Sequence, residues 1–355
     1  MMKWIGWLCT LYLSFSSIRG DCLETERNLF LWTIEKSNGK QVGYLFGTIH
    51  VPYTRIWDRV SNRVKEAFHR ANSVILEVDL QDPSTLRRLI KCKNLKGKQR
   101  SLQYLGPELH QRLQHYFASY RKKLISVLKE RDDAEAAQAV IANFNQAIGG
   151  WDRRRAEWLL FVLYQLCDNN LDREDSPMLD AYLAEMAAAS GKDIHSIETA
   201  NEQCNPVQSL SEEQVVFAIN YTLSYLEYQL ITKRNPSLQQ INRSRRTYDI
   251  VRSYECGSLE NDVFKNTHSN EKFGSHFNQS DVQRAKQIDL ILKDDILIKR
   301  NFRMADRLDK VISKDGETNF FAALGTGHFI GEKNILDLLK DKGYTIKPVK
   351  EDDIV

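Results

Sequence analysis

The sequence has no long apolar run beyond its N-terminal segment. The most apolar later stretch, WLLFVLYQLC at 158–167, is well short of the roughly 20 residues that a membrane-spanning helix needs, and it suits a buried helix. At the N-terminus, Lys3 precedes an apolar stretch that ends in small residues, the layout of a secretory signal peptide. We predict that residues 1–20 are cleaved and that the mature chain, 21–355, is soluble and extracellular. A retained membrane anchor is the alternative.

Three familiar motifs are also absent, and each absence argues against a class of chemistry. There is no C-x-x-C pair, which disfavours a structural zinc site and thioredoxin chemistry. There is no H-E-x-x-H of the zincin metalloproteases and no G-x-S-x-G turn of the serine hydrolases. A hydrolytic site in this chain would therefore need another arrangement of side chains.

Cleavage of the signal peptide would remove Cys9 and leave five cysteines in an oxidising compartment. Because five is an odd number, at least one thiol stays outside the disulfides. Cys167 ends an apolar helical run and is the predicted buried thiol. The other four allow three pairings, and the sequence does not choose among them. These four are Cys22, Cys92, Cys204 and Cys256.

The overall composition does not indicate a class of binding partner. A formal net charge of +3 and 42% hydrophobic residues are ordinary for a soluble globular protein. No nucleic-acid partner is predicted. A basic cluster, KCKNLKGKQR at 91–100, is interpreted as solvated surface or, alternatively, as a contact for a sulfated glycan. Three N-glycosylation sequons agree with export. They begin at Asn220, Asn242 and Asn278.

The apolar patterns predict an α/β fold. LFLWTIEKSNGKQVGYLFGTIH at 29–50 indicates two strands joined by a turn at Ser37-Asn38-Gly39. After a helical pattern, SVILEVDL at 73–80 is a short apolar run typical of a buried strand. Strand, helix and strand in succession indicate a parallel sheet. Further strands are predicted within 191–199, 318–330 and 344–349.

A long helical stretch, from about 106 to 230, separates the first strands from the last ones. We therefore predict one catalytic domain over 21–355, with a central mixed sheet, flanking helices and a helical insertion at about 106–230.

Two of the predicted strands end in the same motif, Gly47-Thr-Ile-His50 and Gly325-Thr-Gly-His328. With 17 Gly and 8 His in 355 residues, chance gives a G-x-x-H about 0.4 times per chain. One such motif would be a turn followed by a loop histidine. A pair, with both members following apolar strands, indicates a shared site.

Functional groups in open α/β sheets gather beyond the carboxyl ends of the strands, so we expect His50 and His328 to meet there. Two imidazoles at one place can bind a divalent metal, or one can act as a base that the other orients. Glu77, at the end of the neighbouring predicted strand, is the carboxylate expected to lie nearest to them, and Asp79 is on the same side of that strand. A charge within an apolar run is costly unless it is paired, which favours a functional role for Glu77. Glu198 is an alternative carboxylate.

Several stretches resemble the TIKI proteins, a branch of the wider TraB group. They include FLWTIEKSNGKQVGYLFGTIHVPYTRIWD, VILEVDL, PMLDAYLAEMA, IETANEQC, IKRNFRMADRL and FFAALGTGHFIGEKNILDLLKDKGY, and the resemblance covers about residues 28–348. Paired G-x-x-H motifs mark the wider group, which resembles the erythromycin esterases in fold. The resemblance implies an extracellular peptidase that depends on Mn²⁺ or Co²⁺, with Zn²⁺ not excluded, and that trims the N-terminal part of Wnt proteins.

The resemblance also implies roles for four residues. His50 and His328 would bind the metal, Glu77 would ligate it or accept the proton of a water, and Arg303 would stabilise the developing oxyanion. His69 lies outside both motifs and serves as a comparison residue whose replacement should leave activity near normal.

Two features depart from the family, and two alternative functions stay open. Phe302 occupies a position where relatives usually carry an acidic residue, and many relatives end in a transmembrane helix that this sequence lacks, so we expect a secreted form or a truncated chain.

One alternative function is a metal-free hydrolase in which His50 is a base paired with Glu77. The other is a binding protein that sequesters a secreted signal without cutting it.

Overall fold

The computed structural model describes residues 29–129, 134–167, 176–232, 251–255, 277–314 and 319–355. The predicted signal peptide, Cys22, Cys256 and the sequon at Asn242 lie outside the described residues.

A mixed sheet of six strands organises the chain, in the order β4-β3-β5-β2-β1-β6. The first four strands in that order run parallel, whereas β1 pairs with both β2 and β6 in antiparallel fashion. This sheet confirms the predicted α/β class. Its strands are β1 (Leu31–Glu35), β2 (Gln41–Thr48), β3 (Ser73–Leu76), β4 (Asp193–Ser196), β5 (Phe320–Gly325) and β6 (Thr345–Pro348).

The predicted hairpin is confirmed, because β1 and β2 pair with Leu31 opposite Phe46. Gly39 in the turn has φ +78°, a backbone conformation that residues other than glycine rarely adopt. At Gly43, a Cβ atom would lie 2.3 Å from the carbonyl oxygen of Phe320. Glycine therefore permits the close approach of β2 to β5, the two strands that carry the paired motifs.

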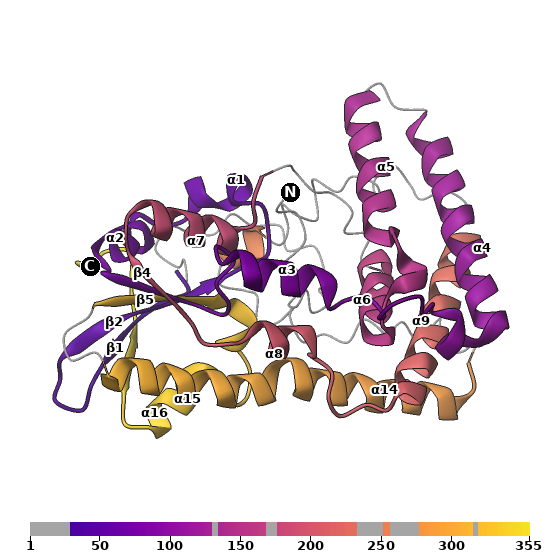
Figure 1. Cartoon of the computed structure of the whole chain (residues 1–355). Helices are drawn as coiled ribbons and strands as arrows, with labels where there is room; N and C mark the ends of the chain where they lie inside the picture. Colours follow the sequence, from indigo (N-terminus) through magenta and orange to yellow (C-terminus); the bar gives the residue numbers. More distant parts are fainter. Residues whose placement is uncertain (1–28, 130–133, 168–175, 233–250, 256–276, 315–318) are drawn as a thin grey trace.

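Helices cover both faces of the sheet (Figure 1). In that view α1, α2 and α7 lie above it and α15 and α16 lie below it. Apolar side chains from these layers form one core, in which Leu45, Leu183 and Leu308 are fully buried. The covering elements are α1 (Tyr53–Ile56), η2 (Trp57–Arg59), α2 (Asn62–Arg70), α7 (Leu179–Ala189), α15 (Lys299–Lys314), η5 (Thr326–His328) and α16 (Ile335–Asp341).

A second group of helices packs beside the sheet around a separate core (Figure 1). We call it the helical half. Its fully buried side chains include Leu113, Phe144 and Leu163. The elements are α4 (Leu102–Leu128), α5 (Ala134–Ile148), η3 (Trp151–Arg153), α6 (Ala156–Cys167), α9 (Glu212–Thr232) and α14 (Gln279–Lys293). Within the described ranges, no helix has both the length and the apolarity to cross a membrane.

One long helical path joins the two cores along the lower edge of Figure 1. It consists of α14, the π-helical turn η4 (Asp294–Ile298) and α15. Leu292 packs in the helical core and Met304 in the sheet core. Because a π-turn inserts one residue into the helix, η4 resets which side chains of α15 face the sheet.

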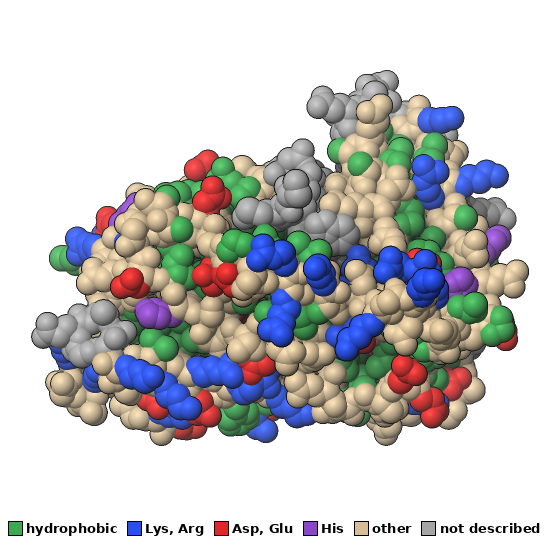
Figure 2. Space-filling model, viewed as in Figure 1, with side chains coloured by type: hydrophobic (Ala, Val, Ile, Leu, Met, Phe, Trp, Pro, Cys, Tyr) green, Lys and Arg blue, Asp and Glu red, His purple; other side chains and the backbone are tan. Residues whose placement is uncertain are grey.

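Two short helices lie between the halves, α3 (Pro83–Lys91) and α8 (Ala200–Cys204). A disulfide between Cys92 and Cys204 ties their C-terminal ends together, which selects one pairing from those that the sequence left open. Cys167 is a thiol, as predicted, but it is half-buried and not buried. Figure 2 shows the same face of the molecule, with Lys and Arg side chains gathered over α3 and the segment beyond it.

Candidate active site

Four parallel strands end at the same edge of the sheet, and each is followed by a residue that the sequence singled out. Along the edge the order is Glu198 after β4, Glu77 after β3, His328 after β5 and His50 after β2. The register places Thr48 opposite Gly325, so the paired G-x-x-H turns begin side by side. The sheet therefore brings these residues to one edge, as expected for the carboxyl ends of parallel strands.

The two G-x-x-H turns are bonded to each other. The Thr326 hydroxyl donates a hydrogen bond to the carbonyl oxygen of Thr48 over 2.8 Å. A Cβ atom at Gly47 would lie only 2.9 Å from Oγ1 of Thr326. The glycine of the first motif thus makes room for the threonine of the second, which gives a packing reason for this repeated pattern.

His328 is fully buried, and its ring is held by Asn301 on α15. The Nδ2 group of Asn301 donates to the carbonyl oxygen of Lys333 over 3.0 Å. This fixes the amide so that Oδ1 faces Nδ1 of His328, 2.6 Å away. Since Oδ1 only accepts, Nδ1 donates the hydrogen of this bond, and Nε2 is the ring nitrogen that faces Glu77.

Glu77 is the carboxylate at the centre of the site. Its Oε1 accepts a hydrogen bond from the Gly325 N–H at 2.9 Å, and its Oε2 accepts one from Nη2 of Arg300 at 2.7 Å. Burial raises the pKa of Glu77, but the charges of Arg300, His328 and His50 outweigh it and lower the pKa from 4.5 to about 2. The carboxylate is therefore ionised at neutral pH.

A buried ion pair stands behind Glu77. Glu198, which is 3% exposed, accepts from Arg300 through both carboxylate oxygens, at 2.9 and 2.6 Å. Gln203 on α8 donates to Glu198 at 2.6 Å and lies 3.4 Å from Glu77. The carboxylate of Glu198, the alternative carboxylate of the sequence, is thus linked to that of Glu77 through Arg300 and Gln203, while the Glu198 N–H donates to the carbonyl oxygen of Glu77 at 2.7 Å. Its place is behind the site.

Arg303, the predicted oxyanion-stabilising residue, lies one turn along α15 from Arg300. Its guanidinium is 3.8 Å from Glu198 and 3.6 Å from Glu202. The arginine that contacts Glu77 directly is Arg300 instead. Phe302, where an acidic residue was expected in relatives, is exposed on the same helix.

His50 meets a carboxylate that the sequence did not single out. Its Nδ1 lies 3.1 Å from Oδ2 of Asp180 in the first turn of α7. A carboxylate on Nδ1 favours the tautomer whose Nε2 can ligate an ion. Asp79, expected on the same side as Glu77, instead accepts from the Gln81 N–H at 2.7 Å, which uses one of its carboxylate oxygens in a turn.

Two side chains of this site, His328 and Glu77, have the donor atoms of ligands to a divalent ion. Nε2 of His328 and Oε1 of Glu77 are 3.6 Å apart, too far for a hydrogen bond. Two ligand atoms about 2.1 Å from one ion, at a tetrahedral angle, lie about 3.4 Å apart. The pair therefore has nearly the spacing of two ligands. In the part of the chain that the structure describes, no set of three or more His, Cys, Asp or Glu side chains is gathered closely enough to hold an ion.

The loop between α8 and α9 is anchored to the long helical path at η4. Asp295, which is 3% exposed, accepts hydrogen bonds from the backbone N–H groups of Gln208 and Ser209, each at 2.7 Å. Lys299 also donates to Asp295, at 2.7 Å. These bonds fix α8, and with it Gln203, relative to Arg300.

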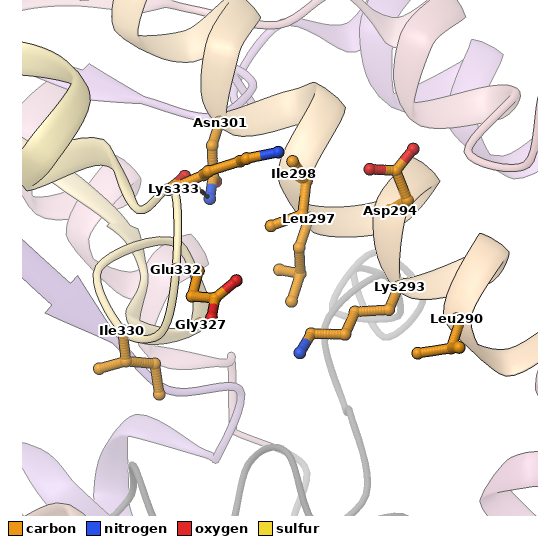
Figure 3. Close-up of a pocket in the computed structure, with 10 residues that line it drawn as sticks. All are labelled: Leu290, Lys293, Asp294, Leu297, Ile298, Asn301, Gly327, Ile330, Glu332 and Lys333. Atoms are coloured by element: carbon orange, nitrogen blue, oxygen red, sulfur yellow. Dashed lines mark hydrogen bonds between the residues drawn. The ribbon is translucent and has the colours of Figure 1, made fainter.

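A pocket of about 190 Å³ lies next to the site, between the long helical path and the segment after His328 (Figure 3). It shares Asn301 and Gly327 with the surroundings of His328, whereas Glu77 and His328 do not line it. In Figure 3, the side chains of Leu297 and Glu332 point into this space. The pocket therefore lies on the side of His328 that faces Asn301 and away from Glu77.

Two of the three predicted glycosylation sites can be placed. Asn220 is exposed on α9 and accepts a hydrogen bond from Arg112 at 2.7 Å. Asn278 is exposed and caps α14 by accepting from the Asp281 N–H at 2.7 Å. In both cases Oδ1 is the bonded atom, so modification at Nδ2 stays a prediction compatible with these positions.

The chain belongs to the TraB/PrgY/gumN family, whose model matches residues 30–348. Within that class it is similar to metalloproteases named TIKI. It is 34% identical to Metalloprotease TIKI2 of Danio rerio, over 91% of this chain and 61% of the relative. It is 32% identical to the Metalloprotease TIKI homolog of Nematostella vectensis, over 91% and 67%. It is 31% identical to Metalloprotease TIKI1 of Homo sapiens, over 91% and 62%.

The chain thus spans 61% of the length of the first of these relatives. No solved structure matches it.

Proposed function

We propose that this chain is an extracellular, divalent-metal-dependent peptidase that cleaves the N-terminal part of Wnt proteins and so antagonises Wnt signalling. The observation that carries the proposal is the closeness of the half-buried Glu77 carboxylate to the Nε2 atom of His328, whose ring Asn301 orients. The similarity to metalloproteases of the TIKI type supports it, and the Wnt substrate rests on the resemblance described above.

In this proposal His50, His328 and Glu77 hold the ion, which is Mn²⁺ or Co²⁺, with Zn²⁺ also compatible with nitrogen and oxygen ligands. When bound, such an ion polarises a carbonyl and lowers the pKa of water. The lowered pKa of Glu77, about 2, makes it a weak proton acceptor, which favours a ligand role for this carboxylate.

The other side chains hold these groups in place. Asn301 and Asp180 orient the two histidines, and Arg300 keeps Glu77 ionised and fixed. Arg303 is about one-third exposed and is proposed to face the developing oxyanion, a role in which a guanidinium would lower the barrier.

The direct test is the mass of a purified Wnt protein after incubation with this chain. The protein is stripped with EDTA, and Mn²⁺, Co²⁺ or Zn²⁺ is then added back to separate samples. We expect a Wnt product shortened at its N-terminus, absent after chelation and restored by Mn²⁺ or Co²⁺. Cleavage that survives exhaustive chelation would favour a metal-free hydrolase using His50 and Glu77. A Wnt protein that is bound but keeps its mass in every sample would favour sequestration.

A further inference from the structure

We propose that α3 and the segment that follows it carry a binding surface for a sulfated glycan. This inference is independent of the peptidase proposal. The surface, called the basic surface below, is defined by five exposed cationic side chains. They are Arg87, Arg88, Lys91, Lys96 and Lys98.

The segment that carries the basic surface has no acidic residue of its own. Residues 83–100 contain no Asp or Glu. None of the five side chains forms an ion pair with a carboxylate of the described residues. Arg100, at the end of the segment, does pair with Asp152, at 3.4 Å. Clustered cations repel one another, and an anion bound across them removes that repulsion.

The spacing of the cations suits a linear ligand. Lys91 lies three and four residues after Arg88 and Arg87, so these three project from one side of α3. Leu89, on the other side, is buried in a small apolar cluster. Figure 2 shows that Lys and Arg side chains continue from α3 along the segment beyond it. The cations therefore form a band across the surface.

The band is held rigidly. The disulfide of Cys92 fixes the end of α3. The Leu95 N–H donates to the carbonyl oxygen of Arg153 at 2.7 Å, and the Arg155 N–H donates to that of Lys93 at 3.0 Å. A surface that is ordered before binding loses less conformational entropy when a ligand binds.

The chemistry favours a sulfated glycan over other polyanions. Residues 83–100 contain no aromatic side chain, so the segment lacks the stacking groups that single-stranded nucleic acids use. The disulfide and the predicted signal peptide both indicate an oxidising, exported environment. The segment exposes one large aliphatic side chain, Ile90, which gives little area for insertion into a lipid surface.

The test compares two variants that lose the same number of charges. In the first, the five residues of the basic surface are replaced by Gln. In the control, five exposed Lys or Arg residues elsewhere, which likewise form no ion pair with the described residues, are replaced by Gln. The control positions are Arg70, Lys286, Lys310, Lys314 and Lys350. Binding of the full chain to immobilised heparin is measured by surface plasmon resonance between about 0.1 and 0.5 M NaCl.

We expect wild-type protein to bind heparin with an affinity that falls as salt rises, because bound counterions are released. The basic-surface variant should bind at least about tenfold more weakly and with a smaller salt dependence, and the control should stay within about twofold of wild type. Both variants should keep the wild-type melting temperature and the wild-type rate of Wnt cleavage measured without glycan.

Three results would overturn the proposal. The first is the absence of wild-type binding to heparin at about 0.1 M NaCl. The second is an equal loss of heparin affinity in the two variants, which would mean that net charge alone explains the binding. The third is binding to anionic phospholipid vesicles or to single-stranded DNA that depends on the basic surface, while heparin binding does not.

Discussion

The sheet and the helical half each have an apolar core, the larger one in the sheet, but they differ in their buried polar groups. At the sheet edge, Glu198, Arg300 and His328 are each 3% exposed or less. Glu198 and Arg300 bond to each other, and His328 bonds to Asn301. In the helical half, Leu113 and Phe144 have no exposed area, and buried polar side chains such as Ser101 and Thr222 are uncharged. Buried polar groups stabilise a fold poorly compared with apolar ones of the same size. The comparison therefore suggests that the helical half supports the fold and the sheet edge carries the chemistry.

The sharpest test of this division is His328→Gln, since the full burial of His328 makes an alanine variant prone to a packing defect. Loss of a ligand should reduce Wnt cleavage at least about a thousandfold, or about 4 kcal/mol in the barrier. Metal content measured by mass spectrometry should fall with it, while the thermal melt changes little.

The control for that variant is His69→Ala, an exposed residue outside both motifs, for which we expect near-normal activity. A His328→Gln protein that keeps its metal and more than about a tenth of the wild-type rate would mean that the two motifs do not share a site.

Glu198→Gln should lower both the stability of the protein and its rate of Wnt cleavage. Removing one partner of a buried ion pair costs about 3–5 kcal/mol of stability, and Arg300 would then hold Glu77 less firmly. We expect a lower kcat with an almost unchanged KM, because Glu198 acts through Arg300, and partial recovery in Glu198→Asp. The matched control, Glu213→Gln, removes an ion pair whose glutamate is 86% exposed. Equal urea-unfolding midpoints for Glu198→Gln and Glu213→Gln would contradict the prediction.

Leu163→Ala probes the helical half. Its side chain is 0% exposed in the helical core, so truncation should cost about 3 kcal/mol of unfolding free energy through a cavity. The rate of Wnt cleavage should stay close to wild type at temperatures where the variant is folded. Ile231→Ala, at a position that is 77% exposed, is the control and should change stability by less than about 0.5 kcal/mol. A large loss of activity in folded Leu163→Ala would show that the two halves are coupled.

The smallest expected effect concerns Glu202, which bonds to Arg307 through both oxygens at 2.7 and 2.8 Å. The hydrogen bond from Arg307, opposed by burial, lowers the pKa of Glu202 from 4.5 to about 2. Its stabilising contribution is therefore complete above pH 4.5 and is lost as the pH falls toward 2. Because Arg307 is one-third exposed, Glu202→Gln should cost only about 1 kcal/mol at pH 7. In urea titrations the difference from wild type should shrink at pH 3, and a constant difference would count against this assignment.

The strand ends could be predicted from the sequence because the apolar runs are short and sharply bounded. Glu77 follows β3 directly, and both histidines follow glycine turns, so the pattern indicated where each side chain emerges. A parallel sheet then brings such ends together without further information.

The partners of those residues could not be predicted in the same way. Arg300 and Arg303 are three residues apart on one helix, so helical spacing puts them on nearly the same side. The π-turn η4, which sets the register of α15, has no clear signal in the sequence. Asp180 and Asn301 look like ordinary polar positions of surface helices until the fold brings His50 and His328 beside them. Asp180 lies in the first turn of α7, where an acidic residue favours any helix, so its position gave no hint of a site.

The disulfide also decides what a broken backbone would do to this protein. Cys92 and Cys204 are 112 residues apart in the sequence, so α4 to α7 and Glu198 lie on a covalently closed ring. A single proteolytic nick within that ring leaves both fragments of the chain joined through the two sulfur atoms. The fragment that carries Glu77 and the one that carries Gln203 would stay tethered beside each other, and the edge of the sheet could survive a cut that would dismantle an open chain.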